Sequence, residues 1–243
     1  MKYILLFFIV TIINAETLPD SHFLLKRGTT IETDSISTEF TYGTNGLGDR
    51  VFKSNEFTLN TRYGIDSISE FNFNYGYSHY TQNINSFMNS SFDETQLGIG
   101  GKYIFSRTQN SIYTFVSNLD LLLNYNKDLF LTFQVSKYNQ YKKFDFGINL
   151  RYITLFEDFG EYSYLTLGVP FTFKLNSFLI NVELGSNQLN GAAFESMFIN
   201  TGFGVKFLKS FIADLHVITS NYQSFGSDLN IRLGVAYNFE AGK

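Results

Sequence analysis

The stretch Leu229-Asn230-Ile231-Arg232-Leu233-Gly234-Val235-Ala236-Tyr237-Asn238-Phe239 carries a bulky apolar residue at every odd position. Its even positions hold Asn, Arg, Gly or Ala. Successive side chains of a β-strand point to opposite faces of the sheet, so this pattern predicts a strand with one apolar and one polar face. The same period of two residues recurs along the chain, and no helical spacing is sustained. The sequence therefore predicts an all-β protein.

The repeated segments set the expected topology. Short links between them, such as 65–67 and 175–177, alternate with longer ones, such as 44–54 and 81–93. An even number of strands of about ten residues, joined by alternating short and long connections, is typical of outer-membrane barrels. We predict a closed antiparallel transmembrane β-barrel of about twelve strands, with ten or fourteen as alternatives. The expected strands lie near 33–43, 55–64, 68–80, 94–105, 112–124, 129–138, 143–155, 162–174, 178–186, 196–207, 211–220 and 228–239.

The composition separates a membrane barrel from a soluble β-sandwich, which is the main alternative for an alternating pattern. Charged residues make up 16% of the chain, below the roughly 25% of soluble domains, and there are 28 Phe and 16 Tyr. The polar faces carry mainly Asn, Ser, Thr, Gln and Gly, where a water-facing sheet would carry Lys and Glu. Beyond the N-terminus no apolar stretch is long enough for a membrane-spanning helix. The low charged fraction, the many aromatic residues and the uncharged polar faces together favour a barrel in a membrane.

The N-terminus has the pattern of an export signal. Lys2 precedes an apolar run over 4–13, and Ala15 offers a small residue for cleavage. We expect a signal peptide over 1–15, a short periplasmic segment over 16–30, the barrel over 31–239 and a tail over 240–243. The expected location is the outer membrane of a Gram-negative bacterium, with both termini periplasmic.

Two stretches carry a resemblance to a known family. The first is Arg62-Tyr63-Gly64-Ile65-Asp66-Ser67-Ile68-Ser69-Glu70-Phe71, and the second is Glu94-Thr95-Gln96-Leu97-Gly98-Ile99-Gly100-Gly101-Lys102-Tyr103. Both resemble strand signatures of the meta-pathway phenol-degradation transporter family. This resemblance implies an outer-membrane barrel that passes small hydrophobic or aromatic compounds.

The parity of each strand sorts its side chains between the two faces. If the apolar face meets lipid, charged residues on the other face line the interior. The candidate interior residues are Glu56, Arg62, Glu70, Lys102, Asp120, Asp145, Arg151, Lys174, Glu183, Lys206, Asp214, His216 and Arg232. The candidate lipid-facing aromatic residues are Tyr63, Phe73, Tyr103, Phe146, Tyr152, Phe173, Phe203, Tyr237 and Phe239.

These features favour a porin-like channel or transporter for small solutes. An interior plugged by paired charges would instead indicate a structural or adhesion barrel that binds ligands through its extracellular loops. An outer-membrane lipid-modifying enzyme is the least favoured function: Ser78 and His79 are adjacent and so point to opposite faces. No cofactor, metal or catalytic residue is expected, and a net charge of −4 does not favour nucleic-acid binding. The expected partners are the lipid bilayer, small solutes and the barrel assembly machinery.

Overall fold

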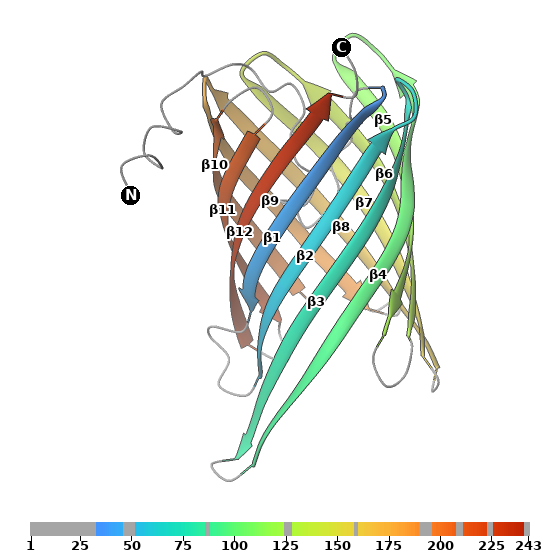
Figure 1. Ribbon diagram of the computed structural model, residues 1–243. Helices are drawn as coiled ribbons and strands as arrows, with labels where there is room; N and C mark the ends of the chain where they lie inside the picture. The colour runs from blue at the N-terminus through green and yellow to red at the C-terminus, as the bar shows by residue number, and fades with distance from the viewer. Residues whose placement is uncertain are drawn as a thin grey trace.

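The computed structural model describes residues 33–45, 52–85, 88–123, 128–157, 160–189, 196–207, 211–222 and 226–240. These form twelve strands in one closed antiparallel barrel, in which each strand pairs with its neighbours in sequence and β1 pairs with β12 (Figure 1). The predicted closed barrel of about twelve strands is confirmed. The strands are β1 (Ser35–Asn45), β2 (Phe52–Gly64), β3 (Ser69–Asn85), β4 (Met88–Arg107), β5 (Ser111–Leu122), β6 (Leu129–Gln140), β7 (Phe144–Glu157), β8 (Gly160–Leu175), β9 (Phe178–Leu189), β10 (Ser196–Phe207), β11 (Phe211–Tyr222) and β12 (Gly226–Glu240).

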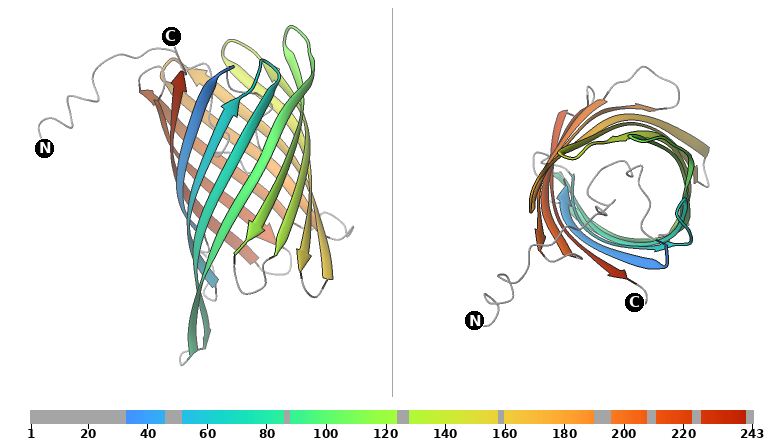
Figure 2. Two further views of the ribbon diagram at one scale, coloured as in Figure 1. Left: turned by 45° about the vertical axis from the view of Figure 1, so that its right-hand side comes forward. Right: turned by 90° about the horizontal axis from the view of Figure 1, so that it is seen from above.

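One rim of the barrel carries the tight turns. There β1 begins opposite the end of β12, with Ser35 paired to Glu240, and the turn between β8 and β9 spans only two residues (Figure 1). In that turn Asn176 has a φ of 52°, a left-handed conformation that Asn tolerates better than most residues. Closure leaves every strand paired on both sides, so the sheet has no free edge (Figure 2).

The hairpin of β3 and β4 extends beyond the opposite rim (Figure 1). Its pairing continues through Thr81 and Ser91 to Asn83 and Asn89, where the sequence predicted a loop over 81–93. That prediction was wrong because backbone pairing needs no apolar side chain. Polar residues past the end of an amphipathic face can still form a two-stranded ribbon.

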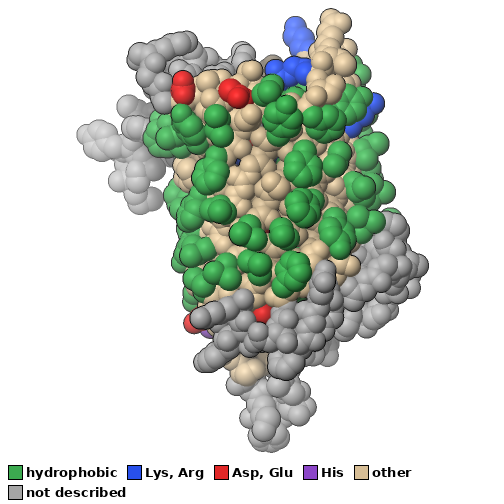
Figure 3. Space-filling model, turned by 90° about the vertical axis from the view of Figure 1, so that its right-hand side faces the viewer, with side chains coloured by type: hydrophobic (Ala, Val, Ile, Leu, Met, Phe, Trp, Pro, Cys, Tyr) green, Lys and Arg blue, Asp and Glu red, His purple; other side chains and the backbone are tan. Residues whose placement is uncertain are grey.

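The two faces of the barrel wall differ sharply in polarity. The outer face carries large apolar side chains such as Phe40, Ile99 and Leu233, of which Leu233 is 54% exposed. Figure 3 shows hydrophobic side chains spread over one side of this face, with charged side chains gathered at its ends. The inner face carries buried polar residues such as Asn149 and Glu183. No helix in the described ranges is long and apolar enough to cross a membrane.

The expected segments 1–15 and 16–30 lie outside the described residues. The first strand begins at Ser35, and the last strand ends at Glu240, one residue into the expected tail.

Candidate functional site in the barrel interior

The structure places all thirteen candidate interior residues on the strand face opposite the exposed apolar side chains. Eight of them are buried: Arg62, Glu70, Lys102, Asp120, Asp145, Glu183, Asp214 and His216. The other five are partly exposed: Glu56, Arg151, Lys174, Lys206 and Arg232. Alternation places these residues on one face, because inward and outward side chains of a barrel strand follow a strict period of two.

The candidate lipid-facing aromatic residues lie on the outer face. Eight are exposed: Tyr63, Phe73, Tyr103, Tyr152, Phe173, Phe203, Tyr237 and Phe239. The ninth, Phe146, is partly covered, because its ring stacks with the rings of Tyr141 and Phe171 at centroid distances of 6.2 and 6.3 Å.

Four charged side chains from β1 to β4 form a buried ion-pair chain. Arg62 contacts Glu39 at 2.9 Å and Glu70 at 3.6 Å, and Lys102 contacts Glu70 at 3.4 Å. All four side chains are at most 2% exposed. Two acids and two bases on adjacent strands cancel each other's charge, which makes their joint burial tolerable. This chain, Glu39–Arg62–Glu70–Lys102, fills part of the interior.

A second polar cluster lies across β9, β10 and β11. The Nδ1 atom of His216 is 2.9 Å from the side-chain oxygen of Asn200, and the amide of Asn200 donates to Glu183 at 3.4 Å. Asp214 lies 3.5 Å from the other ring nitrogen of His216. Elsewhere on the inner face, Lys174 pairs with Asp145 at 2.7 Å. The inner wall therefore carries several local polar networks, and a cavity lies between some of the strands that carry them.

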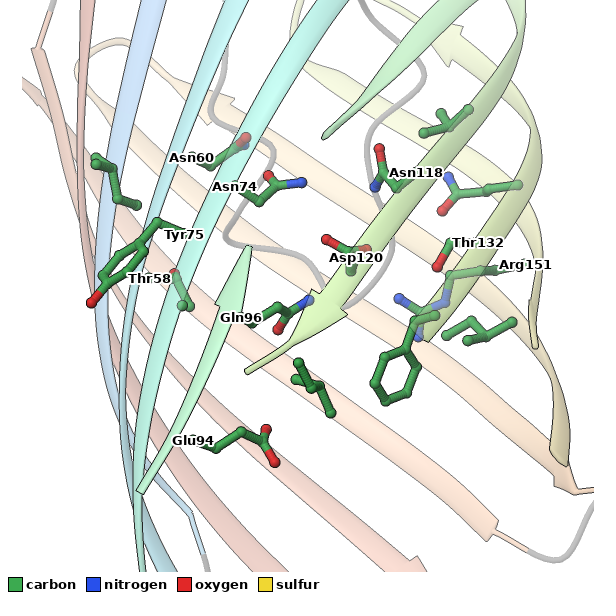
Figure 4. Close-up of a pocket in the computed structure, with 17 residues that line it drawn as sticks. Thr58, Asn60, Asn74, Tyr75, Glu94, Gln96, Asn118, Asp120, Thr132 and Arg151 are labelled. Carbon is green, nitrogen blue, oxygen red and sulfur yellow. The ribbon is translucent and has the colours of Figure 1, made fainter. Parts of the chain in front are cut away.

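The cavity has a volume of about 400 Å³, within the range of about 300–1,000 Å³ that is usual for small-ligand sites. Figure 4 shows side chains from β2 to β7 around it, with Asn74, Gln96 and Asp120 turned toward the same space. The residues at the cavity are Thr58, Leu59, Asn60, Asn74, Tyr75, Gly76, Glu94, Gln96, Val116, Asn118, Asp120, Leu122, Phe130, Thr132, Gln134, Arg151 and Ile153.

Glycines on the inner face let large side chains lie flat against the wall. Five of them are paired directly across the sheet with a larger residue: Gly98 with Asp120, Gly100 with Asn118, Gly147 with Tyr138, Gly185 with Phe198, and Gly202 with His216. In each pair the side chain occupies the space that a Cβ atom on the glycine would need. The larger residues of two of these pairs, Asn118 and Asp120 on β5, line the cavity.

Sequence reasoning missed part of this site. Glu39 lies on the predicted polar parity of its strand, so the same alternation identifies it. The five amides at the cavity, Asn60, Asn74, Gln96, Asn118 and Gln134, also lie on the polar parity of their strands. Asn and Gln occupy the polar face of most strands, so alternation does not distinguish these five, and only the register and curvature of the sheet bring them to one cavity.

The histidine near the end of β3 lies on the outer face. His79 Nδ1 is 2.6 Å from Asp93 Oδ1, and the Tyr77 hydroxyl donates to the same oxygen at 2.9 Å. His79 and Tyr77 therefore share Asp93 as a hydrogen-bond partner. The ring of the nearby Tyr80 stacks on the ring of Phe92, with a centroid distance of 4.8 Å. The described residues include no group of three or more His, Cys, Asp or Glu side chains suited to a metal ion.

Comparison with solved structures shows the same barrel fold. The COG4313 outer membrane channel from Pseudomonas putida F1 matches with a TM-score of 0.61 and 13% identity, over 92% of this chain and 99% of that one. The translocator domain of the autotransporter NalP from Neisseria meningitidis matches with a TM-score of 0.57 and 11% identity, over 84% and 87%. LpxR from Salmonella typhimurium matches with a TM-score of 0.55 and 6% identity, over 84% and 99%. No family model and no curated protein matches the sequence.

Proposed function

We propose that this protein is an outer-membrane channel that passes small solutes through its interior. The observation that carries the proposal is a cavity of about 400 Å³ inside a closed barrel whose outer face is apolar. Outer-membrane barrels combine an apolar outer band with a polar interior. The fold shared with the channel from Pseudomonas putida F1 is consistent with this function.

The outer face supports the membrane location. Its exposed apolar side chains, such as Phe71, Ile148 and Phe203, recur around the barrel from strand to strand. In water such a band would far exceed the few hundred Å² that soluble monomers leave uncovered. In a bilayer the exposed apolar band contacts lipid, and the closed sheet pairs the backbone hydrogen-bonding groups of every strand.

The orientation in the membrane follows from the turns. The rim with the short turns lies in the periplasm, together with the start of β1 and the end of β12. We propose that the chain reaches this location by export through a cleaved signal peptide over 1–15 and by insertion by the barrel assembly machinery.

Two observations bear on the class of solute: the family resemblance and the lining of the cavity. The family resemblance of the segments over 62–71 and 94–103 implies small hydrophobic or aromatic compounds. Four apolar side chains at the cavity, Val116, Leu122, Phe130 and Ile153, favour a solute with an apolar surface. The polar residues around them favour a solute that also forms hydrogen bonds.

A structural or adhesion barrel is the second function, and the projecting hairpin of β3 and β4 favours it. A ribbon that extends beyond the membrane could contact a partner at the cell surface. The two functions differ in whether ions pass through the barrel.

Conductance of the mature chain, residues 16–243, refolded and inserted in a planar lipid bilayer, tests the proposal. We expect stable conductance steps in salt solution, with no added solute. A folded barrel that inserts without conducting would contradict the channel function and leave the hairpin as the candidate functional element. Heat-modifiable migration on a gel provides the independent check that the protein has folded as a barrel.

A further inference from the structure

We propose that the cavity between β2 and β7 binds a small uncharged polyhydroxylated solute, such as a sugar of one or two rings. This inference rests on the proposed channel function and names the solute class that the channel selects. Three features of the lining support it: the number of amides, the apolar patch and the balance of charge.

The amide side chains provide donors and acceptors together. Asn60 and Asn74 reach the cavity from β2 and β3, Gln96 from β4, and Asn118 and Gln134 from β5 and β6. Each amide offers two N–H donors and one carbonyl acceptor, and each hydroxyl group of a sugar is both a donor and an acceptor. Three of the amides already donate one N–H within the wall: Asn60 to Glu39, Asn74 to Asn72 and Gln134 to Ser136. An amide with one N–H engaged can form further hydrogen bonds, so a ring with several hydroxyl groups can contact several amides at once.

The apolar patch suits the other face of such a ring. Leu122 on β5, Phe130 on β6 and Ile153 on β7 form this patch at the cavity, where Phe130 is paired with Asp120, two residues from Leu122. Val116 lies six residues from Leu122 on the same strand, about 20 Å away, and is not part of the patch. The amides from β2, β3 and β4 line the side of the cavity formed by those strands (Figure 4). A sugar ring has an apolar C–H face and a hydroxylated rim, so it matches a site with both kinds of surface.

The charges at the cavity favour a neutral solute. Glu94 and Asp120 are acidic and Arg151 is basic, and all three line the same space (Figure 4). A solute with a full charge of either sign meets both a like and an opposite charge in this space, so the attraction and the repulsion partly cancel. A neutral hydroxyl donates to a carboxylate and accepts from a guanidinium, and hydrogen bonds to charged groups are stronger than neutral ones.

A simple aromatic alcohol fits less well. It has a single hydroxyl group, so it can form hydrogen bonds with few of the amides at the cavity. Polar groups that are desolvated without a partner oppose binding.

Binding to the refolded mature chain, residues 16–243, tests the inference, with glucose, sucrose and phenol as probes. Saturation-transfer NMR measures weak binding directly and does not depend on ion conduction. We expect saturable binding of glucose or sucrose, which phenol does not displace. The same sugars should reduce the channel current in a planar bilayer, because a bound solute blocks the path.

Two variants locate the site. Asn74→Leu and Gln96→Leu each remove one amide at the cavity without changing the charge, and each should weaken sugar binding about three- to tenfold. The matched control is Asn230→Leu, which removes an inward amide on β12, away from the cavity, and should leave binding unchanged.

The outcomes separate the two proposals. Phenol that binds more tightly than the sugars and competes with them would overturn the sugar inference, while conductance in salt would still support a channel. An equal loss of sugar binding in Asn230→Leu and in the cavity variants would also overturn it. Sugar binding that depends on Asn74 and Gln96 in a barrel without conductance would support the site and contradict the channel.

Discussion

The carboxylate of Asp120 on β5 lies flat over Gly98 on β4, its partner across the sheet, with its Cγ atom 2.8 Å from the position that a Cβ on Gly98 would occupy. The adjacent pair, Gly100 and Asn118, repeats the arrangement. Both pairs keep polar side chains that line the cavity close to the wall.

Gly98→Ala should narrow the cavity without preventing folding. The added methyl group collides with the end of the Asp120 side chain, which can rotate away from the wall and into the open space. We expect a folded barrel with lower conductance in a planar bilayer. The control is Gly204→Ala on β10, where the nearest atoms are 3.4 Å from the added Cβ and conductance should not change.

Gly100→Ala should instead impair assembly. The added Cβ collides with the backbone carbonyl of Ser117 as well as with Asn118, and a backbone atom cannot rotate away. Overpacking of this kind costs about 1–3 kcal/mol. The yield of folded barrel on a heat-modifiability gel should fall below that of Gly98→Ala, and the reverse order would contradict this account of the two glycines.

An arginine on the outer face should block insertion, whereas one on the inner face should not. Ile99 is 50% exposed on the outer face of β4, and Gln96 points into the cavity from the same strand. An Arg at the bilayer midplane costs about 2–4 kcal/mol, so Ile99→Arg should fold poorly in vesicles while Gln96→Arg folds well. Similar folded fractions for the two variants would contradict the proposed lipid contact of the outer face.

Loss of Arg62 should strongly destabilise the barrel. Its removal leaves Glu39 without its 2.9 Å contact and Glu70 without one of its cations, in a buried setting. Breaking a buried ion pair in this way costs about 3–5 kcal/mol, so Arg62→Leu should lower the free energy of unfolding in urea by about that amount. Lys53→Leu, at an exposed position on the same strand, should change it by less than about 0.5 kcal/mol.

A double variant checks the cause of that loss. If uncompensated charge dominates, adding Glu39→Gln to Arg62→Leu should restore part of the stability. A further loss of stability would point to packing by the Arg62 side chain as the main contribution.

The turn between β2 and β3 should respond to acid. The backbone N–H of Ile68 donates to Asp66 at 2.8 Å, and this bond lowers the pKa of Asp66 below its usual value of 3.8. A lowered folded-state pKa means that the stabilisation is present above pH 3.8 and is lost as the pH falls through the folded-state value. The stability difference between the native chain and Asp66→Ala should therefore be larger at pH 5 than at pH 2. Urea unfolding at both values measures this difference, and an unchanged difference would exclude the hydrogen bond as its source.

Alternation in the sequence was sufficient to predict the class of fold. Segments such as 229–239 assign each side chain to one of two faces, and the number of such segments gives the strand count. The thirteen candidate interior residues follow from the same rule. The rule could not predict where β3 and β4 end, because strand pairing continues through polar residues that carry no amphipathic signal.

The sequence by itself determined which face each side chain occupies, because a period of two follows from the geometry of any strand. Only the closed barrel decided which inward residues meet. Glu39 contacts Arg62 because of the register between the paired strands β1 and β2, whereas Asn60 on β2 and Gln134 on β6 share a cavity because the sheet curves into a barrel. The pairing that lets the Asp120 side chain lie over Gly98 is likewise a match between two strands that neither strand encodes alone.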